Sequence, residues 1–297
     1  MTVREKIEHV IFDFDGTCTD IPAIADNFLR SYFTRLNEQL FADAPIGNSE
    51  WNDALKEIRQ ASPDAGWTVA KTPSAPAGAD PYILSFEAAQ FLLRKRGLEL
   101  PIPSDVYKAA DEENPPPLRP ELKGVLLFLI ERGVPVTFIS NSSTTKIRGR
   151  LITLFDGSIP TLLRIETGGA KYSVSEPLVG DTMLSNGVLA AFRDLPAAVN
   201  CGGLDRPVYL RRANYAAAIS RTLAGDVALL SRTLFCGDIW EMDLAMPFHL
   251  GASIHFIERA APFTTYPYEI AQITRAANRA RSSVNLDGLH QWFGAGK

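Results

Sequence analysis

The sequence predicts an α/β protein: a doubly wound, Rossmann-like parallel sheet with a smaller, mainly helical domain inserted into it. Three observations support this fold class. Short apolar runs end in polar side chains at Asp13, Ser140 and Asp238, and in open parallel sheets the carboxyl ends of strands are where ligands bind. Helical patterns alternate with these runs, which is typical of βαβ units. A long segment with apolar residues at helical spacing separates the first run from the second.

The first apolar run, Val10–Phe12, leads directly into Asp13, Asp15, Gly16 and Thr17. Because alternate residues of a strand share a face, the two carboxylates leave the strand end close together. They repel each other, and a hard divalent cation with oxygen ligands relieves the repulsion. Gly16 permits a sharp turn toward a ligand. The alternative, for this motif taken alone, is an ordinary buried strand that ends in a polar Asp-Gly turn.

Two later apolar runs also end in polar side chains. The second run ends in a hydroxyl and an amide, and the third leads into a Gly-Asp pair with another carboxylate five residues further on. These residues are Ser140, Asn141, Gly237, Asp238 and Asp243. Since the carboxyl ends of parallel strands meet at one edge of a sheet, we expect these side chains to gather around one site, with the Asp13 strand between the other two.

Together the three strand ends resemble the motifs of the haloacid dehalogenase (HAD) superfamily, in its phosphatase branch with a helical cap. The resemblance rests on Asp-x-Asp-Gly-Thr at 13–17, Ser-Asn at 140–141 and Gly-Asp-x-x-x-x-Asp at 237–243. It covers the core at both ends of the chain and not the segments between the motifs. It implies a catalytic core of residues 1–20 and 118–297, with residues 21–117 as a helical cap over the active site.

The resemblance also implies roles for the site residues. Asp13 would be the nucleophile that forms an aspartyl-phosphate, and Asp15 the general acid and then the base. Mg²⁺ would be held by the Asp13 carboxylate, the backbone carbonyl of Asp15, and Asp238, together with the phosphate itself. Asp243 would orient the cation or its basic neighbour. The phosphate-binding set would comprise Gly16, Thr17, Ser140, Asn141 and a basic residue.

Asp15 discriminates among the chemistries of the superfamily. A halide leaving group needs no proton, and the family's dehalogenases lack a carboxylate at this position. The resemblance therefore implies a magnesium-dependent phosphomonoester hydrolase that acts on a small phosphorylated metabolite. The alternatives are a phosphotransferase or phosphomutase with the same intermediate, or a catalytically impaired binding protein that keeps the fold.

The basic residue is missing from its usual place, because the family carries a lysine about 25 residues before the Gly-Asp motif to bind the phosphate as a point charge. That region contains Arg211 and Arg212 and no lysine. We favour Arg212, which stands where the following helix would begin. Lys171 is the rival, since the neighbouring glycines indicate a loop that could fold back. Lys146 is a weaker candidate and is expected to be a solvated surface charge.

The proposed cap segment is expected to be mostly helical. Helices are expected over 24–40, 53–60, 81–96 and 104–113. Ser104 would cap the last of these. The stretch 61–80 is rich in Pro, Ala and Gly and is expected to be a loop. Hinges between cap and core are expected near 18–22 and 115–119.

Further elements are expected in the core. They are helices over 119–133, 189–194 and 244–250, and strands over 161–165, 172–174 and 252–257. The stretch 156–206 is longer than the usual link in this family. It is consistent with a flap beside the cap, an interface or an extended connection, and the sequence does not choose between them.

Composition excludes several classes of partner. A net charge of −4 and a pI near 5.7 give no electrostatic footprint for nucleic acid. No apolar run approaches the roughly 20 residues that span a bilayer. An odd count of three cysteines suits a reducing compartment, so a cytoplasmic location is expected. The four histidines do not cluster. Trp51 and Trp67 are expected to be packing residues, or else a wall of the substrate pocket. The oligomeric state is left open.

Overall fold

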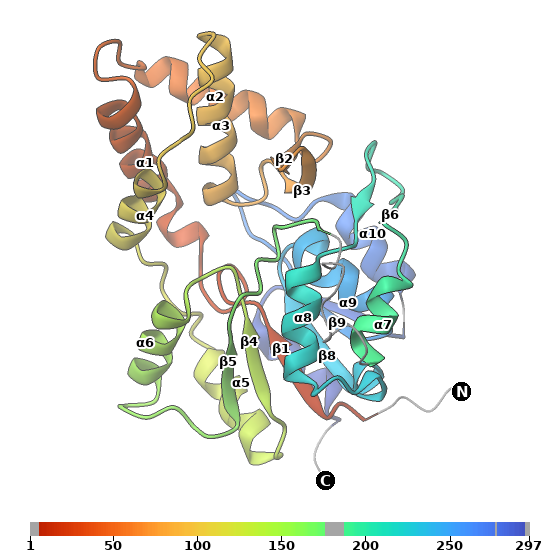
Figure 1. The fold of residues 1–297 in the computed structure, drawn as a ribbon. Coiled ribbons are helices and arrows are strands. Elements are labelled where there is room, and N and C mark those ends of the chain that lie inside the picture. The colour runs from red at the N-terminus through yellow and green to blue at the C-terminus, as the bar shows by residue number, and fades with distance from the viewer. Residues whose placement is uncertain (1–5, 176–186, 277, 295–297) are drawn as a thin grey trace.

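A parallel sheet with strand order β10-β9-β8-β1-β4-β5 forms the centre of the molecule (Figure 1). The computed structural model describes residues 6–175, 187–276 and 278–294. The strands are β1 (His9–Phe12), β4 (Val136–Ile139), β5 (Leu163–Glu166), β8 (Thr233–Gly237), β9 (Ser253–Ile257) and β10 (Ala280–Ser283). The predicted doubly wound α/β fold is confirmed. As expected, β1 lies between β4 and β8, which brings the three polar strand ends to one edge.

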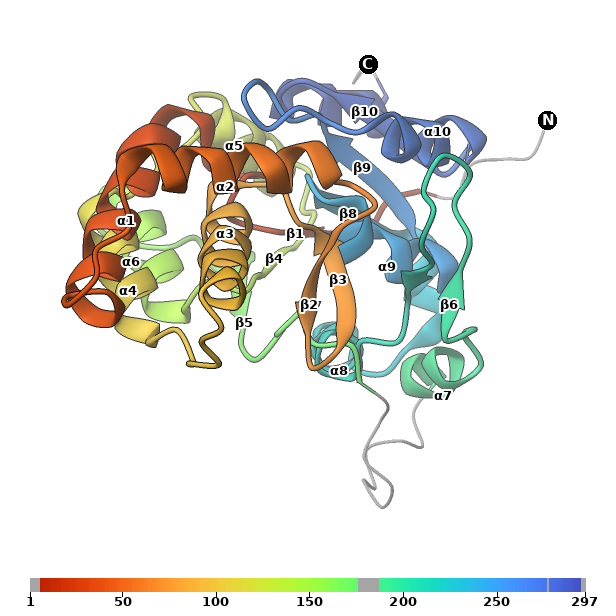
Figure 2. The same ribbon diagram turned by 90° about the horizontal axis from the view of Figure 1, so that it is seen from above.

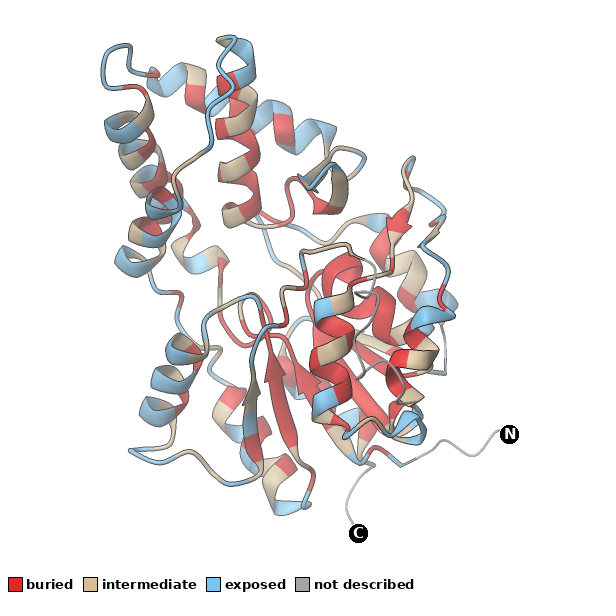
Figure 3. Ribbon diagram, in the orientation of Figure 1, coloured by how far each residue is buried: buried red, intermediate tan, exposed pale blue. Residues whose placement is uncertain are grey.

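Both faces of the sheet are covered, which is why its central strands read as continuous apolar runs. Ile11 packs into a hydrophobic cluster on one face, whereas Val10 and Phe12 pack into a second cluster on the other. Strands β4 and β8 are buried along their whole length (Figure 3). Alternate side chains of each strand therefore pack into different clusters. Because both faces are apolar, the strands show no alternation of polar and apolar residues in the sequence.

Helices and short helical turns supply the rest of these clusters. The cluster around Ile11 contains residues of α7 (Gly187–Arg193), α8 (Ala213–Thr222), α9 (Ala245–His249), α10 (Pro267–Arg275) and the 3₁₀ helix η3 (Val227–Arg232). The opposite cluster contains residues of α5 (Leu122–Glu131), α6 (Thr144–Leu154) and the 3₁₀ helix η5 (Leu286–Trp292). The expected strand over 172–174 is wrong: these residues form a turn, and Ser175 makes one isolated bridge with Arg212.

Residues 22–113 form a helical unit with a hydrophobic cluster of its own. Its elements are η1 (Pro22–Ile24), α1 (Ala25–Leu40), α2 (Asn48–Ala61), β2 (Gly66–Val69), β3 (Thr72–Pro76), α3 (Pro81–Lys95) and α4 (Ser104–Glu113). The expected helices are present. Ser104 is the first residue of α4 and not its cap, because the cap position is taken by Pro103.

The expected loop over 61–80 contains an antiparallel hairpin, β2–β3, so this expectation is wrong in part. Ala70 and Lys71 form its two-residue turn with φ of 48° and 71°. Such left-handed values usually require Asn or Gly at the turn. The sequence therefore gave no hairpin signal at this position.

The chain enters and leaves the helical unit through two adjacent extended segments. Thr19 forms an antiparallel bridge with Leu118. The backbone N–H of Asp20 donates to the Pro117 carbonyl at 2.8 Å, and the N–H of Arg119 donates to the Cys18 carbonyl at 2.9 Å. These crossings lie within the two segments where hinges are expected.

The helical unit also contacts the core far from these crossings. The Ser62 hydroxyl lies 2.7 Å from the Tyr266 hydroxyl, and Phe263 of the core packs into the helical unit's own cluster. The hairpin β2–β3 extends from the helices toward the core (Figure 2), where β3 contacts β7 (Val208–Tyr209). Strand β7 pairs with β6 (Ala198–Val199) in a small separate sheet. The helical unit is therefore held at two places.

Among the helices of the described ranges, none has both the length and the apolar character needed to cross a bilayer. Cys18, Cys201 and Cys236 are buried, and none forms a disulfide.

His255 on β9 is fully buried and bonded at both ring nitrogens. Its Nδ1 accepts from the indole N–H of Trp292 at 2.9 Å, and its Nε2 lies 2.7 Å from the Ser283 hydroxyl. A neutral imidazole with its proton on Nε2 satisfies both contacts. Burial, and then the charge of Arg281, lower the pKa of His255 to about 3.

We expect His255 to make the protein less stable in acid. Below pH 6.5 this histidine is protonated in the unfolded chain but stays neutral in the folded chain. The free energy of unfolding therefore falls as pH falls. This linkage amounts to about 2 kcal/mol at pH 5. The free energy of unfolding should be measured with urea at pH 7 and at pH 5. Its decrease between the two pH values should be about 2 kcal/mol smaller for His255→Gln than for the unmodified protein. Equal losses would contradict the assignment.

Candidate active site

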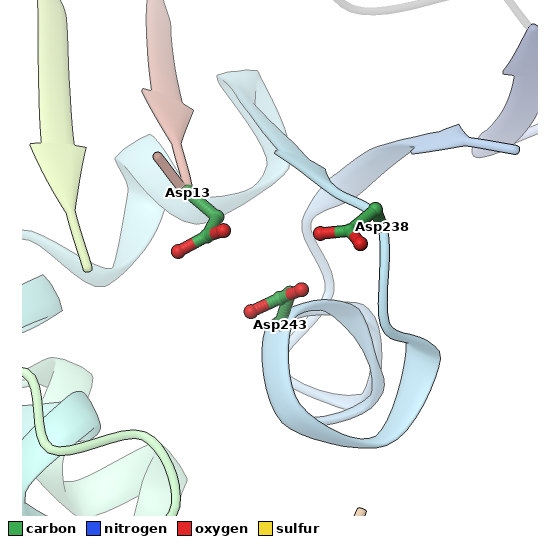
Figure 4. Close-up of side chains that lie close together, drawn as sticks. All are labelled: Asp13, Asp238 and Asp243. Atoms are coloured by element: carbon green, nitrogen blue, oxygen red, sulfur yellow. The ribbon is translucent and has the colours of Figure 1, made fainter. Parts of the chain in front are cut away.

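Three buried carboxylates meet at the carboxyl ends of β1 and β8. Asp13 follows β1, Asp238 follows β8, and Asp243 lies in the π-helical turn η4 (Trp240–Leu244). One oxygen from each carboxylate lies within 4.8 Å of the others. Figure 4 shows the side chains directed into one shared space. The parallel register of β1 and β8 thus brings together residues that are more than 200 positions apart in sequence.

Lys171 lies between two of these carboxylates. Its Nζ is 2.5 Å from Asp13 Oδ1 and 2.5 Å from Asp243 Oδ1, and its side chain is 1% exposed. Burial alone would lower the pKa of Lys171, but the Asp13 and Asp243 carboxylates outweigh this and raise it. The side chain is therefore an ammonium, and it compensates part of the negative charge of the cluster.

The structure places Lys171, and neither Arg211 nor Arg212, against Asp13, which corrects our preference for Arg212. Arg211 points away from the cluster and donates to the Leu195 carbonyl through Nε and Nη2, at 3.0 and 2.8 Å. Arg212 is buried but does not contact a cluster carboxylate. Lys171 lies in the loop that follows β5, so its proximity to Asp13 depends on long-range chain folding and not on local spacing.

The loop before Lys171 is held closely over the end of β4. A Cβ on Gly169 would lie 2.9 Å from Ile139 Cγ2, so the chain can approach this closely only with glycine. The Asn141 Oδ1 accepts from the Lys171 backbone N–H at 2.8 Å. Asn141, expected to bind phosphate, thus fixes the lysine loop in this structure while also lining the adjacent cavity.

Arg212 connects the lysine loop to the hairpin of the helical unit. Its guanidinium donates to the Ser74 hydroxyl at 2.8 Å, to the Ser74 carbonyl at 2.7 Å and to the Lys171 carbonyl. A planar guanidinium can serve all three acceptors at once, which an ammonium cannot do with the same geometry. Arg212 therefore positions Lys171 through its backbone.

Asp15 lies beside the cluster at the edge of a cavity. Its Oδ2 accepts from the Ser142 hydroxyl, and its Oδ1 is 3.7 Å from Lys146 Nζ, beyond hydrogen-bonding distance. Lys146 on α6 is bound by Asp111 of α4 at 2.9 Å. Its side chain is only 20% exposed. The expectation of a solvated surface charge is thus wrong for Lys146, and the role of Ser142 was missed although it directly follows the Ser-Asn motif.

Two glycines allow the carboxylates to approach one another. Gly16 has φ of 84°, and a Cβ there would lie 2.4 Å from Asp238 Oδ2. A Cβ on Gly237 would lie 2.3 Å from Asp243 Cβ. Thr17 donates its hydroxyl to Asp238 Oδ1 at 3.2 Å. Gly16, predicted as a turn residue, and Gly237, the last residue of β8, therefore make room for the acidic cluster.

A second layer of contacts that the sequence did not reveal supports Asp238. Arg259 donates to the Asp238 carbonyl and pairs with Glu269, with Nη2 2.5 Å from Oε2. Glu269 also accepts from the Trp240 backbone N–H at 3.1 Å, which fixes the start of η4. No local motif links these residues, so sequence reasoning had no signal for them.

The cluster remains electronegative even with Lys171 in place. Burial raises the pKa of Asp13, and burial together with the neighbouring Asp243 carboxylate raises that of Asp238. Three carboxylates face one ammonium here, and the donor atoms are all oxygens. This donor set fits a hard cation such as Mg²⁺.

A cavity of about 900 Å³ opens from the acidic cluster toward the helical unit. Residues at the strand ends line its core side: Asp13, Asp15, Ser140, Asn141 and Asp238. Trp67 also lines the cavity, in agreement with the alternative expectation that it forms a wall of the substrate pocket. Trp51 instead stacks on Tyr32 and Phe33 within the helical cluster, at ring distances of 6.2 and 5.3 Å.

No model of a protein family and no curated protein matches this chain. Solved structures do. YfnB of Bacillus subtilis, described as a HAD-hydrolase bound to magnesium, is 13% identical with a TM-score of 0.51, over 98% of this chain and 100% of that one. A predicted phosphoglycolate phosphatase of Haemophilus somnus is 15% identical, with a TM-score of 0.49 over 98% and 99%. The L-2-haloacid dehalogenase of Xanthobacter autotrophicus is 17% identical, with a TM-score of 0.45 over 96% and 97%.

At these identities the likeness shows the fold alone. The chain shares its fold with YfnB. The other neighbours are described as phosphatases and as dehalogenases.

Gly16→Ala should weaken cation binding, and the effect should exceed that of a glycine-to-alanine change with the same backbone strain elsewhere in the chain. The new Cβ would displace the Asp238 carboxylate, so we expect the affinity for Mg²⁺ to fall by roughly tenfold or more. Gly97→Ala is the matched control, since Gly97 has φ of 69° and open space around its Cβ position. Both variants should lose about 1–2 kcal/mol of stability through the left-handed backbone. Calorimetric titration with Mg²⁺ separates them, and equal affinities in the two variants would contradict the prediction.

Proposed function

We propose that this protein is a magnesium-dependent phosphomonoester hydrolase that acts on a phosphorylated metabolite through an aspartyl-phosphate intermediate. The observation that carries the proposal is that Asp13 and Asp15 line the cavity together while Lys171 is paired with Asp13. A buried carboxylate paired with an ammonium lies beside a second carboxylate that faces the cavity. This arrangement supplies a nucleophile, a charge partner and a proton carrier in one place.

Asp13 would attack phosphorus and displace the alcohol of the ester, forming an acyl phosphate. The charge of Lys171 opposes the rise that burial causes in the pKa of Asp13, and it also favours the approach of a dianionic phosphate. Covalent catalysis of this kind divides one difficult displacement into two easier ones. Ser140, which is buried at the end of β4 and lines the cavity, can donate its hydroxyl to a phosphate oxygen.

Asp15 would donate a proton to the leaving alcohol oxygen and then remove one from the water that hydrolyses the acyl phosphate. The Ser142 hydroxyl donates to Oδ2, whereas Oδ1 makes no hydrogen bond within the described part of the chain and lies 3.7 Å from Lys146 Nζ. A carboxyl group that lines the cavity next to the nucleophile is suited to proton transfer. It is also the feature that favours a phosphatase over a dehalogenase, because a halide needs no proton.

Asp13 and Asp238 would hold the cation, with Asp243 and the Asp15 backbone carbonyl as further oxygen ligands. When bound, Mg²⁺ neutralises the repulsion between the phosphate and the carboxylates. Asp243 has a second task, since it also holds Lys171. Its Oδ2 accepts from the Ile239 N–H at 3.0 Å, which keeps the side chain directed at the lysine.

Residues 21–117 would act as the cap that closes the site. The extended crossings at Thr19 and Leu118 would be its hinges, and the cavity between cap and core would exclude water during transfer. A phosphotransferase that uses the same intermediate is the second candidate, differing only in the acceptor. The three free, buried cysteines support a cytoplasmic location as part of this proposal.

Phosphate release from a panel of phosphomonoesters, with Mg²⁺ and with EDTA, tests the proposal. Asp13→Asn should lose turnover by at least about 10³-fold without unfolding, because the amide is isosteric but not nucleophilic. Asp43→Asn, an exposed aspartate on a loop of the helical unit, is the control and should keep full activity. Metal-independent release, or an active Asp13→Asn variant, would refute the mechanism.

Asp15→Asn should distinguish the acid from the nucleophile. An ester with a good leaving group, para-nitrophenyl phosphate, needs little protonation, so its first step should slow less than that of an alkyl phosphate. Single-turnover rates of alcohol release from the two esters measure this difference. Equal slowing of both would argue against the acid role.

A further inference from the structure

The cavity that reaches the acidic cluster has two chemically different ends. Its core side is formed by the polar strand ends, as described above. Its cap side is largely aromatic and aliphatic, with Trp67, Tyr82, Phe86, Ile102 and Tyr107 among the lining residues, and Ile239 and Met242 extend this surface from the core. A volume of about 900 Å³ is at the upper end of the range for small-molecule sites, far more than a phosphate group needs.

Aromatic side chains on the cap side of the cavity, which we call the aromatic wall, include Trp67, Tyr82, Phe86 and Tyr107. Phe28 lies behind this wall and contacts Tyr82 and Tyr107 edge-on, with ring centroids 4.7 and 6.1 Å apart. Tyr82 and Tyr107 also meet edge-on at 5.7 Å. Where the hairpin reaches the core, Trp67 packs on Tyr172 at 5.8 Å. Such mutual packing fixes the rings, so the wall is preformed for an apolar ligand.

Several charged groups that line the cavity are engaged within the protein. Asp80 accepts from the Ile83 N–H at 2.7 Å, and Asp111 binds Lys146 at 2.9 Å. Arg150 of α6, on the core side, donates to the Pro116 carbonyl at 2.5 Å. Lys108 and Glu112 are exposed. On the cap side, the carboxylates of Asp80, Asp111 and Glu112 outnumber the one ammonium of Lys108, which disfavours a second anionic group on a substrate.

We propose that the substrate is a phosphomonoester whose alcohol carries a bulky, aromatic or otherwise apolar body, rather than a sugar phosphate or a phosphorylated carboxylic acid. The phosphate would lie at the acidic cluster and the apolar body against the aromatic and aliphatic side chains of the cap side. This inference rests on the proposed phosphatase activity and adds the class of leaving group to it.

Two pairs of esters with matched leaving groups test the apolar body. Hexyl phosphate and glucose 6-phosphate both release a primary alcohol with six carbons, and 2-naphthyl and phenyl phosphate both release a phenol-type alcohol. We expect kcat/KM to be at least about tenfold higher for hexyl phosphate than for glucose 6-phosphate, and at least about fivefold higher for 2-naphthyl than for phenyl phosphate. Equal or reversed preferences would overturn the inference while leaving the phosphatase proposal intact.

A pair of variants on one helix places the preference at the aromatic wall. Phe86 and Phe91 are both half-buried on α3, but only Phe86 lines the cavity. Phe86→Ala should reduce the ratio of kcat/KM for 2-naphthyl over phenyl phosphate by about threefold or more, and Phe91→Ala should leave that ratio unchanged. An unchanged ratio in a folded Phe86→Ala variant would refute the wall as the binding surface.

If no ester is hydrolysed, the phosphatase proposal fails, and calorimetry decides the inference separately. Binding of 2-naphthyl phosphate at least fivefold tighter than phenyl phosphate would support the apolar site, and equal binding would overturn it.

Discussion

Repulsion among buried carboxylates is the constraint on which the rest of this structure depends. Asp13, Asp238 and Asp243 lie too close together to be stable as three uncompensated charges in a site that excludes water. Lys171 compensates part of the charge, and the glycine turns at 16 and 237 give the carboxylates room. The loop glycines, the Asn141 bond and the buried Arg212 all serve to bring that one ammonium to its place. A cluster organised in this way is prepared for a cation and an anionic substrate together.

The cavity combines contributions from two parts of the chain. Backbone geometry at the ends of parallel strands supplies the polar groups, which is why they occur in short motifs. The opposite wall is made from helices and a hairpin, where many sequences pack equally well and no motif is required. Chemistry and selectivity are therefore encoded differently in this chain. A reaction class can be argued from a few residues, whereas the leaving group has to be argued from the shape and polarity of a surface.

The same distinction explains how far the sequence alone could be used. Strands β1, β4 and β8 were predictable because buried parallel strands are short continuous apolar runs followed by polar turns. Hairpin β2–β3 was missed because Ala70 and Lys71 adopt left-handed backbone angles without the usual residues. Lys171 was only one of several candidates, since its position beside Asp13 depends on a loop that folds over another strand. The pair Arg259–Glu269 was missed entirely, because contacts between distant positions leave no local pattern.

The contacts of Arg212 with Ser74 have a consequence for how a cap could move. A body attached along one line can swing freely, but this helical unit is held both at the crossings near Thr19 and Leu118 and at the hairpin. Two separated attachments define an axis. When the helical unit rotates about this axis, the parts farthest from the axis move the most. The edge where α4 faces α6, bridged by Lys146 and Asp111, is then the side on which the cavity would open to solvent. A ligand would pass between these two helices, while the aromatic residues of the hairpin stayed against the core.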